Sequence, residues 1–566
     1  MKKTLSIALA ILMSFSILTV AFAENNLPSS YSSVDEGYVT SVKDQDISSI
    51  CAAYACVSCI ESDYIKKGYG TKDDTDFSEV FFYWSSLYSY CSDESSGYFG
   101  DGLDAFEGYV DYDAGLYAAE YLSSLKTDTA IAYEKDFPTE LLYSDNADSF
   151  AEASKYSTGC NVRVDEVVLF DSYDTTNVKK WVKEHGAAFV GYYSDKYYSN
   201  GGNTTAYTFS LFGLPNHLVT IVGWDDNFKA EGFGSSIIMP RKGAWLCKNS
   251  WGEGWGDNGY FWLPYNYSSI DSIGGLSVYL NDDCTDRYSY NGMTSYTNTP
   301  DGVNKCANYF TARHSGDITK FAYFGYENMV VTLSLYEDNG DKVPDSGELL
   351  AKVETHSDYF GYHFVDIPEP YQIEEGQSFW VVVSFDDYYL LEFESFEATN
   401  DREGESFMLQ NGEWKDLDES DQYGNVPVDV VLLTEHKYGE PVTVDPVCET
   451  DGYTRISCEI CGKSINTPIP APGYHTYGEW TEEIEISEDR PGLYKRVCEV
   501  CENEEYKMVY ADGSEVAIDS DEVYFNLYFG GDSSGSFNLF ESILSFFAHL
   551  ASLIRERLFI LNLFMF

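Results

Sequence analysis

The residues of this chain best suited to chemistry are Cys51 and the polar side chains that could assist it. A cysteine thiol is a weak nucleophile until its pKa falls or a base takes its proton. The polar "DQDISS" precedes Cys51 and the apolar "CAAYACVSCI" follows it, which predicts a helix N-terminus, where the helix dipole favours a thiolate. Far downstream, His217 opens "HLVTIVGWDDN" and Asn249 precedes "SWG". These two could supply a base and an orienting amide, and the Gln45 amide could donate to an oxyanion.

Two kinds of element must position these residues. The apolar pattern from Cys51 to about residue 65 predicts a helix that begins at the cysteine. The later runs "AAFVGYY" and "LVTIVGW" are rich in β-branched residues and bounded by glycine or asparagine, which is typical of strands. Helices early and strands later predict an α+β fold for residues 24–288.

Residues 289–435 have a different pattern. "TKFAYFGY", "MVVTLSLYED", "GYHFVDI" and "QSFWVVVSF" are short alternating runs, separated by turn-rich segments such as "EDNGDKVPDSGE". Regular short strands of this kind predict an all-β sandwich. No catalytic constellation is visible in it, so we expect a binding or spacer module.

Several sequence blocks resemble the papain family of cysteine peptidases. Glutamine, cysteine, histidine and asparagine follow one another in the family's order, with Gln45 six residues before Cys51. "KNSWGEGWGDNGYFW" is a highly specific match to the family's asparagine block, and "LPSSYSSVDEGYVTSVKDQ" resembles the start of the mature enzymes. The resemblance covers residues 27 to about 280. It is closest to the secreted bacterial and archaeal branch, in which a lectin-like β-sandwich often follows the peptidase.

The resemblance implies a fold and a set of roles. The fold would be a papain-like peptidase of two subdomains, a helical left half and a β-barrel-like right half. Cys51 would be the nucleophile, His217 the base and then the acid, and Asn249 the residue that orients the imidazole. Gln45 and the Cys51 amide would form the oxyanion hole, and Trp251 would shield the bond between asparagine and histidine from water.

The resemblance also implies a substrate cleft. The glycine-rich "GYFGDGLDAFEGYV" is similar to the stretch that lines the cleft in the family, which points to Gly100 and Gly102, together with Asn216 beside the histidine. Catalysis of this kind needs no cofactor. The expected partners are protein or peptide substrates and, through the lectin-like β-sandwich, a cell-surface glycan. The chain is expected to be a monomer.

The surroundings of the nucleophile depart from the family pattern C-G-S-C-W. Ser48 stands in place of the first cysteine, so the family's usual bridge there is absent, and Ala52 replaces the aromatic residue after the nucleophile. Neither change removes a reacting group, but both alter the packing at the helix start. His217 lies 166 residues beyond Cys51, more than the roughly 130–150 usual in papain-like enzymes, which predicts an insertion near residues 120–205.

Residues 436–510 hold a weak duplication. His436 begins "HKYGE" and His475 begins "HTYGEW", and the first copy has Cys448 where the second has Ser487. Each copy ends in a C-x-x-C pair, namely Cys458 with Cys461 and Cys498 with Cys501. The four thiolates could hold one structural zinc ion, and two local disulfides suit an exported chain equally well. The sequence leaves both hypotheses open.

The two ends of the chain and its charge bear on location. Residues 1–23 are typical of a secretory signal peptide, with two early lysines, an apolar run and a small-x-small cleavage site ending at Ala23. Residues 511–566 are predicted to be an acidic linker and an apolar C-terminal helix. The net charge of −58 repels nucleic acid and anionic lipid. The chain is therefore expected to be extracellular, free or attached to the cell surface.

The favoured function is that of a secreted cysteine endopeptidase, which forms a thioester acyl-enzyme that water hydrolyses. A surface adhesin or lectin that keeps a weakened or inactive peptidase scaffold is the alternative, and the changes at Ser48 and Ala52 keep it open. A transferase that passes the same thioester to an amine is a third hypothesis. Nothing in the sequence separates it from a hydrolase.

Overall fold

The computed structural model describes residues 27–46, 48, 50–82, 131–139, 160–194, 198–199, 204–206, 213–228, 242–267, 269–290, 296–392, 403–420, 422–449, 451–461, 463–487, 491–501 and 503–518. The expected signal peptide at 1–23 and nearly all of 511–566 lie outside these ranges. Within the ranges, no helix combines the length and the apolar character needed to cross a membrane.

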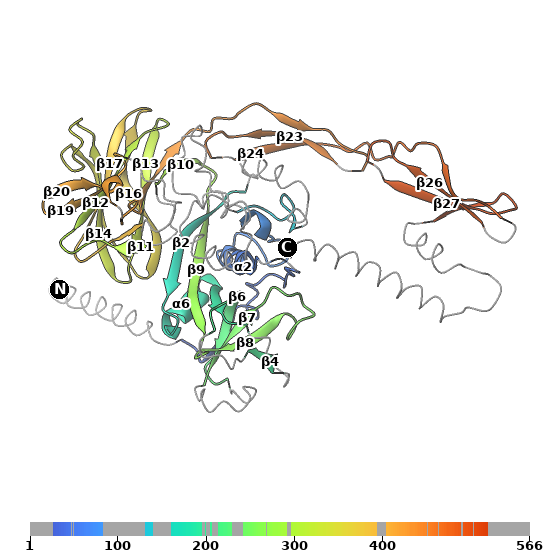
Figure 1. Cartoon of the computed structure of the whole chain (residues 1–566), viewed down its shortest axis with the longest axis horizontal. Helices are drawn as coiled ribbons and strands as arrows, with labels where there is room; N and C mark the ends of the chain where they lie inside the picture. Colours follow the sequence, from blue (N-terminus) through green and yellow to red (C-terminus); the bar gives the residue numbers. More distant parts are fainter. Residues whose placement is uncertain are drawn as a thin grey trace, which may run out of the picture. The chain divides into compact units, whose positions relative to one another are not determined.

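Helix α2 (Cys51–Lys66) begins at the cysteine, as the sequence predicted. It is a core helix, because side chains on every side of it are buried, including Cys56 and Cys59, which are fully buried and not in disulfide bonds. Ala52, one of the departures from the family pattern, is among these buried residues. The helix lies against strands β6 and β9 (Figure 1).

A mostly antiparallel sheet covers α2, in the order β2-β9-β3-β6-β7-β8-β5-β4, with β1 paired to β6. Its strands are β1 (Ser30–Ser32), β2 (Val162–Phe170), β3 (Ala188–Tyr192), β4 (Tyr198–Ser199), β5 (Thr205–Ala206), β6 (His217–Asp225), β7 (Ala244–Lys248), β8 (Tyr260–Pro264) and β9 (Ile270–Leu280). The strands predicted from "AAFVGYY" and "LVTIVGW" are confirmed as β3 and β6.

Strand β6 is buried on both faces because a helix packs on each side of this sheet. Leu218 and Val222 belong to the core that contains α2, whereas Val219 and Ile221 belong to the core of helix α6 (Thr175–His185). This alternation is the period of two expected of a strand. Strand β6 therefore has a fixed register, and His217 at its first residue has a fixed place.

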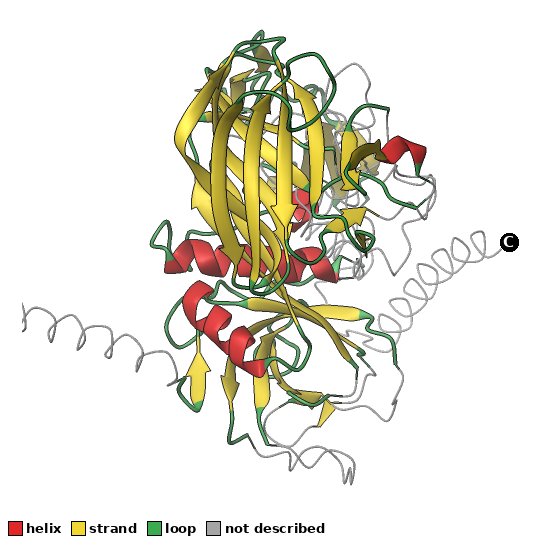
Figure 2. Ribbon diagram, turned by 90° about the vertical axis from the view of Figure 1, so that its left-hand side faces the viewer, coloured by secondary structure: helices red, strands yellow, loops and turns green. Residues whose placement is uncertain are grey.

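The predicted all-β half is confirmed as two packed layers. The first holds β10 (Cys284–Tyr288), β13 (Gly316–Gly325), β16 (Phe360–Ile373) and β21 (Val428–Thr434). The second holds β12 (Lys305–Thr311), β14 (Met329–Glu337), β15 (Leu349–Ser357), β17 (Ser378–Phe385), β19 (Ser406–Gln410) and β20 (Glu413–Asp416). Smaller elements are β11 (Tyr296–Asn298), β18 (Leu390–Glu392) and the 3₁₀ turn η5 (Leu417–Glu419). Inward residues of both layers form one core, and Figure 2 shows these strands above the two helices.

The two halves share one continuous sheet, which the sequence did not indicate. Strand β16 pairs with β2, with Phe360 opposite Leu169 and His363 opposite Glu166. Strand β10 lies before the expected boundary at 288/289 and pairs with β21 of the all-β half. The chain therefore passes into the all-β half without leaving the sheet.

The duplicated region forms small hairpins. Strands β22 (Val442–Val444), β23 (Gly452–Ser457) and β24 (Ser464–Ile469) make one sheet, and β25 (Thr481–Ile484), β26 (Gly492–Val497), β27 (Glu504–Val509) and β28 (Glu515–Ile518) make another. The second sheet extends beyond residue 510, where the repeat was expected to end. The few buried residues of this region are mostly cysteines.

Candidate active site

Cys51 is the first residue of α2, and its sulfur lies among backbone amides. The amides of Leu218, Ala52 and Cys51 itself hydrogen-bond to it. Leu218 follows His217, so the sulfur lies against the start of the strand that carries the histidine. Burial raises the pKa of the thiol, and these three amides lower it only in part. The thiol is therefore neutral at rest and needs a base to become a nucleophile.

The turn that precedes α2 is held by Ser48. Its amide and its hydroxyl both donate to the Gln45 carbonyl, at 3.0 and 2.5 Å. The Gln45 Nε2 donates in return to the Ser48 carbonyl at 2.6 Å. Between them, Asp46 has a φ of 50° and donates its amide to Asp44 Oδ1. The serine that departs from the family pattern thus holds this turn by hydrogen bonds.

His217 and Asn249 are hydrogen-bonded in a way that determines which imidazole nitrogen carries the proton. Asn249 Oδ1 lies 2.8 Å from His217 Nε2 and accepts the backbone N–H of Ser250 at 2.9 Å. Because a backbone N–H can only donate, the side-chain atom of Asn249 at this position must be oxygen. His217 Nε2 must then be the donor, and in a neutral imidazole the lone pair lies on Nδ1. Nδ1 is therefore free of a proton and can accept one.

An aromatic layer covers this pair. The Trp251 ring stacks on the His217 imidazole, with centroids 4.6 Å apart and an angle of 19° between the planes. Trp255 meets Trp251 edge-on, and Phe261 packs edge-on against Trp255. His217 and Asn249 are 4% and 3% exposed. Exclusion of water strengthens the hydrogen bond between them.

Ser250 is a residue that the sequence reasoning missed. Its hydroxyl donates to the side-chain oxygen Oε1 of Gln45 at 2.5 Å. Its backbone carbonyl accepts the backbone N–H of Gln45 at 2.8 Å. Its own amide donates to Asn249 Oδ1. One serine therefore positions both side-chain amides of the candidate site. Its place between Asn249 and Trp251 in "KNSWG" was the available signal.

Buried charged and polar side chains near Ser250 connect α2 to strand β7, which ends at Lys248. Lys248 Nζ donates to Thr40 Oγ1 at 3.0 Å, and Thr40 Oγ1 donates to Glu61 Oε2. Lys43 Nζ donates to carboxyl oxygens of Glu61 and Glu79 at 3.1 and 2.8 Å. Burial lowers the pKa of Lys248 to about 8 and raises that of Glu79 to about 8. The network fixes the segment before Asn249 to the helix of Cys51.

Burial also governs the state of the histidine. It lowers the pKa of His217 to about 4, against a smaller opposing effect of the hydrogen bond that the imidazole donates to Asn249. At neutral pH the resting site therefore contains a neutral thiol and a neutral imidazole.

Of the three residues expected in the substrate cleft, the structure describes one. Asn216 is exposed, and its Oδ1 accepts the Ser194 amide at 2.7 Å. It therefore holds the loop after β3 beside the histidine. Gly100 and Gly102 lie outside the described residues.

Each C-x-x-C pair lies with a histidine and a third cysteine. The first cluster is Cys284, His436, Cys458 and Cys461, and the second is Cys448, His475, Cys498 and Cys501. The two pairs thus belong to two clusters, instead of sharing the one four-thiolate site considered from the sequence. All of these cysteines are outside disulfide bonds.

Comparison with known families agrees with this geometry. Residues 27–277 match the family model described as papain family cysteine protease, and residues 287–430 match the one described as lectin like domain. A cysteine proteinase of Theileria annulata is 27% identical over 164 residues, which are 29% of this chain and 31% of that protein. One from Carica papaya is 44% identical over 60 residues, 10% of this chain and 57% of that protein. The chain thus spans a third to a little over half of these relatives.

Solved structures extend the likeness to both halves of the fold. The clostridial cysteine protease Cwp84 after propeptide cleavage has 24% identity and a TM-score of 0.57, covering 72% of this chain and all of that chain. A structure of the cysteine protease and lectin-like domains of Cwp84, a surface layer associated protein of Clostridium difficile, has 22% identity and a TM-score of 0.57, covering 72% of this chain and 90% of the other. This likeness concerns the fold.

Proposed function

From the premise that residues 27–277 are a papain-family cysteine protease domain and residues 287–430 a lectin-like domain, we propose that this chain is an exported endopeptidase. The proposal takes Cys51 as the nucleophile, His217 as the base and Asn249 as the residue that orients the base. The observation that carries it is the bond between His217 Nε2 and Asn249 Oδ1, because it leaves the lone pair on Nδ1.

The reaction follows from that protonation state. His217 Nδ1 takes the thiol proton as the Cys51 sulfur attacks the peptide carbonyl carbon. The C–N bond then breaks, and the imidazolium returns the proton to the leaving amine. Water, deprotonated by the same imidazole, hydrolyses the thioester and frees the thiol. Trp251, stacked on the imidazole, keeps water from the hydrogen bond that orients it.

The oxyanion of the tetrahedral intermediate needs donors, and two are proposed. One is the amide of Cys51 at the first turn of α2. The other is Gln45 Nε2, which gives one hydrogen to the Ser48 carbonyl and has a second for the oxyanion. The cleft, with Asn216 near its histidine, would lie between a mainly helical and a mainly β subdomain, as in the family.

The place of action is proposed to be outside the cell or at its surface. The signal-peptide pattern of residues 1–23 and the net charge of −58 support export. Cwp84, which has the same pair of domains in its fold, is described as surface-layer associated. The lectin-like domain would then hold the peptidase at a surface glycan while it cuts protein substrates.

Ser250→Ala tests the proposed placement of Gln45. We expect kcat to fall about 10- to 100-fold with little change in KM, because the Gln45 amide loses the partner that directs its second hydrogen. Steady-state kinetics on a fluorogenic peptide measure this. In the Gln45→Ala background the same change should cost almost nothing more. Full additivity of the two losses would contradict a shared role.

The pH dependence follows from the low pKa of His217. Because burial holds that pKa at about 4, the base stays neutral and active until the pH falls through that value. The acid limb of kcat/KM should therefore have a midpoint near pH 4, and the alkaline limb should lie above the ordinary thiol value because the pKa of Cys51 is raised. An acid midpoint near the ordinary histidine value of about 6.5, with circular dichroism showing an intact fold, would contradict this electrostatic picture.

Casein cleavage tests the function as a whole. The purified full chain should release casein fragments, and a thiol-directed epoxide should stop the reaction. The sizes of the fragments distinguish endopeptidase from exopeptidase action. If the chain leaves casein intact but binds glycans through its lectin-like domain, it is the adhesin considered above. If added amines appear in the products in place of water, it is a transferase.

A further inference from the structure

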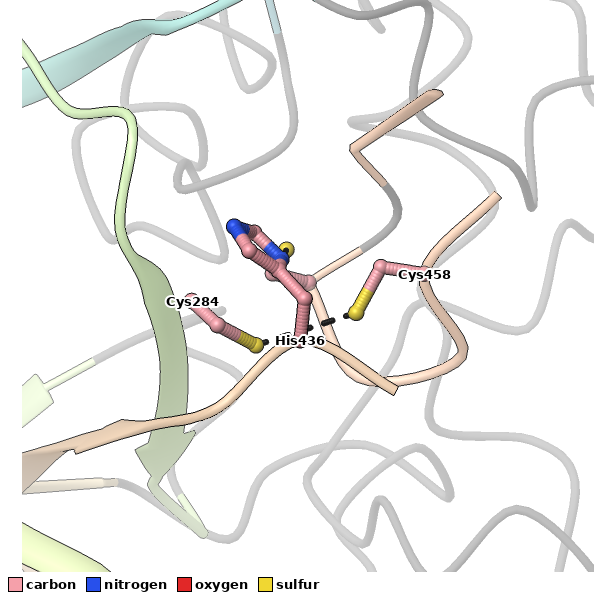
Figure 3. Close-up of side chains that lie close together, drawn as sticks. Cys284, His436 and Cys458 are labelled. Atoms are coloured by element: carbon pink, nitrogen blue, oxygen red, sulfur yellow. Dashed lines mark hydrogen bonds between the residues drawn. The ribbon is translucent and has the colours of Figure 1, made fainter. Parts of the chain in front are cut away.

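Outside the candidate active site, the clearest arrangement of reactive side chains is the pair of cysteine–histidine clusters in the duplicated region. In each cluster, one ligand atom from each of three cysteines and one histidine lies within 4.8 Å of all the others. Figure 3 shows Cys284, His436 and Cys458 of the first cluster converging from separate segments of the chain. Three thiols and one imidazole match a Cys₃His structural zinc site.

One sulfur–sulfur distance in each cluster fits two ligands of a shared metal and is too long for a bond between those two cysteines. The sulfur atoms of Cys284 and Cys458 are 3.7 Å apart, and those of Cys448 and Cys498 are 3.5 Å apart. Tetrahedral ligation with Zn–S near 2.3 Å puts two sulfurs about 3.8 Å apart, whereas a disulfide bond is about 2.05 Å long.

The sulfur–nitrogen distances agree as well. Cys461 Sγ lies 3.4 Å from His436 Nδ1, and Cys501 Sγ lies 3.2 Å from His475 Nδ1. With Zn–N near 2.05 Å, the tetrahedral value is about 3.5 Å.

The other ring nitrogen of each histidine faces an oxygen atom, within hydrogen-bond distance for His436 and at a longer distance for His475. His436 Nε2 lies 3.1 Å from the Asp282 carbonyl, and His475 Nε2 lies 3.8 Å from a Glu449 carboxylate oxygen. A metal-binding imidazole almost always directs its other N–H to such an oxygen. Asp282 lies two residues before Cys284 of the first cluster. Glu449 lies one residue after Cys448 of the second.

The two C-x-x-C turns repeat the same backbone bonds. The Cys458 amide donates to the Lys463 carbonyl at 2.9 Å, and the Cys498 amide donates to the Asn503 carbonyl at 2.8 Å. Two separate copies of the sequence thus build the same cysteine turn. The recurrence argues for a common ligand.

These hairpins need such a ligand because they have almost no core of their own. In the described residues of 436–518, the buried positions are four cysteines, two glycines and Leu493. Small modules that lack an apolar core depend on a metal or on disulfides. Here the cysteines that occupy the core are the ligands themselves.

We propose that Cys284, His436, Cys458 and Cys461 bind one zinc ion, and that Cys448, His475, Cys498 and Cys501 bind a second. Each copy supplies a histidine and a C-x-x-C pair, and takes its third cysteine from the segment before it. Cys284 of strand β10 serves the first copy, and Cys448 of the first copy serves the second. Ser487 stands at the corresponding place in the second copy, and residues 502–566 contain no cysteine.

Metal analysis of the full chain tests this. The protein carrying Cys51→Ala, a change that removes the proposed nucleophile and so any proteolysis during preparation, should contain two zinc ions by mass spectrometry. Cys284→Ser and Cys498→Ser should each remove one, and together should remove both. Cys306→Ala, at a fully buried cysteine of β12 outside both clusters, should keep two. Cys284→Ser is the decisive variant, because neither a shared four-thiolate site nor local disulfides involve that residue.

Cobalt provides a second measurement if a variant folds poorly. Co²⁺ added to the zinc-free chain should give thiolate charge-transfer bands for two tetrahedral ions, and His436→Ala should lower the stoichiometry to one. Unchanged zinc in Cys284→Ser would overturn the proposal. Loss of all zinc in Cys498→Ser alone would indicate one shared site and would also overturn it. A metal-free chain whose C-x-x-C pairs are oxidised to disulfides would do the same.

Discussion

Replacement of Cys51 by alanine is expected to lower kcat/KM for peptide hydrolysis by at least about 10⁴-fold. The substitution removes the only atom at the start of α2 that can form the thioester. The proposed oxyanion donors, the amide of residue 51 and Gln45 Nε2, remain in the variant, so a weak residual rate is compatible with the mechanism. Progress curves with a fluorogenic peptide measure the loss.

Cys56→Ala is the matched control. This cysteine lies on the same helix, is completely buried and carries the same side chain. Its replacement leaves a small cavity and should reduce stability modestly, while kcat/KM stays within a few-fold of the wild-type value. Equal activity losses in the two variants would mean that packing of α2, not thiol chemistry, limits the rate.

The second large effect is expected at the base. His217→Gln should lower kcat about 10³- to 10⁴-fold, because a glutamine can still hydrogen-bond to Asn249 but cannot carry a proton from the thiol. KM should change little, since His217 is nearly buried and its proposed role concerns the reacting atoms, not the bulk of the substrate. Single-turnover kinetics should show the loss in the acylation step.

His185→Gln is the control for that change. His185 ends α6, where its Nδ1 lies 2.9 Å from Asp63 and its ring stacks on Trp181. It is partly buried, as a structural histidine often is, but belongs to another part of the fold. A loss of thermal stability with normal kcat is expected. If this variant lost activity as His217→Gln does, a general loss of folding would explain both.

Much of the candidate site could be predicted because its members lie in local patterns. The helix that begins at Cys51, the strand that begins at His217 and the block around Asn249 each have their own signature in a short stretch of sequence. Gln45 was recognised by its spacing from the cysteine. Two of these residues, His217 and Asn249, are hydrogen-bonded to each other across 32 positions.

What could not be predicted depends on contacts between distant segments. The pairing of β16 with β2 joins two sheet edges, and edge pairing leaves no period in the sequence. Ser250 acts through Gln45, which is 205 positions away. Nothing in the sequence around Ser250 therefore indicated that its hydroxyl has a special partner. Cys284 lies in a strand of ordinary alternation, and nothing local connects it to Cys458, 174 positions later.

The cysteine count illustrates the same limit. An odd total of thirteen indicated an unpaired or metal-bound cysteine but not which one. In the structure, six of them divide into two sets of three, each completed by a histidine. The histidines were visible as the start of each copy. That each histidine lies beside three cysteine sulfur atoms is visible only in the folded hairpins.

The most direct test of the account is to identify the atom that a mechanism-based inhibitor modifies. The full chain is incubated with a thiol-directed epoxide, digested and analysed by tandem mass spectrometry, with the zinc sites kept loaded. The account predicts one adduct per chain, located on Cys51, absent from Cys51→Ala and formed far more slowly in His217→Gln. An adduct on any other residue, or labelling and casein cleavage that both persist in Cys51→Ala, would contradict it.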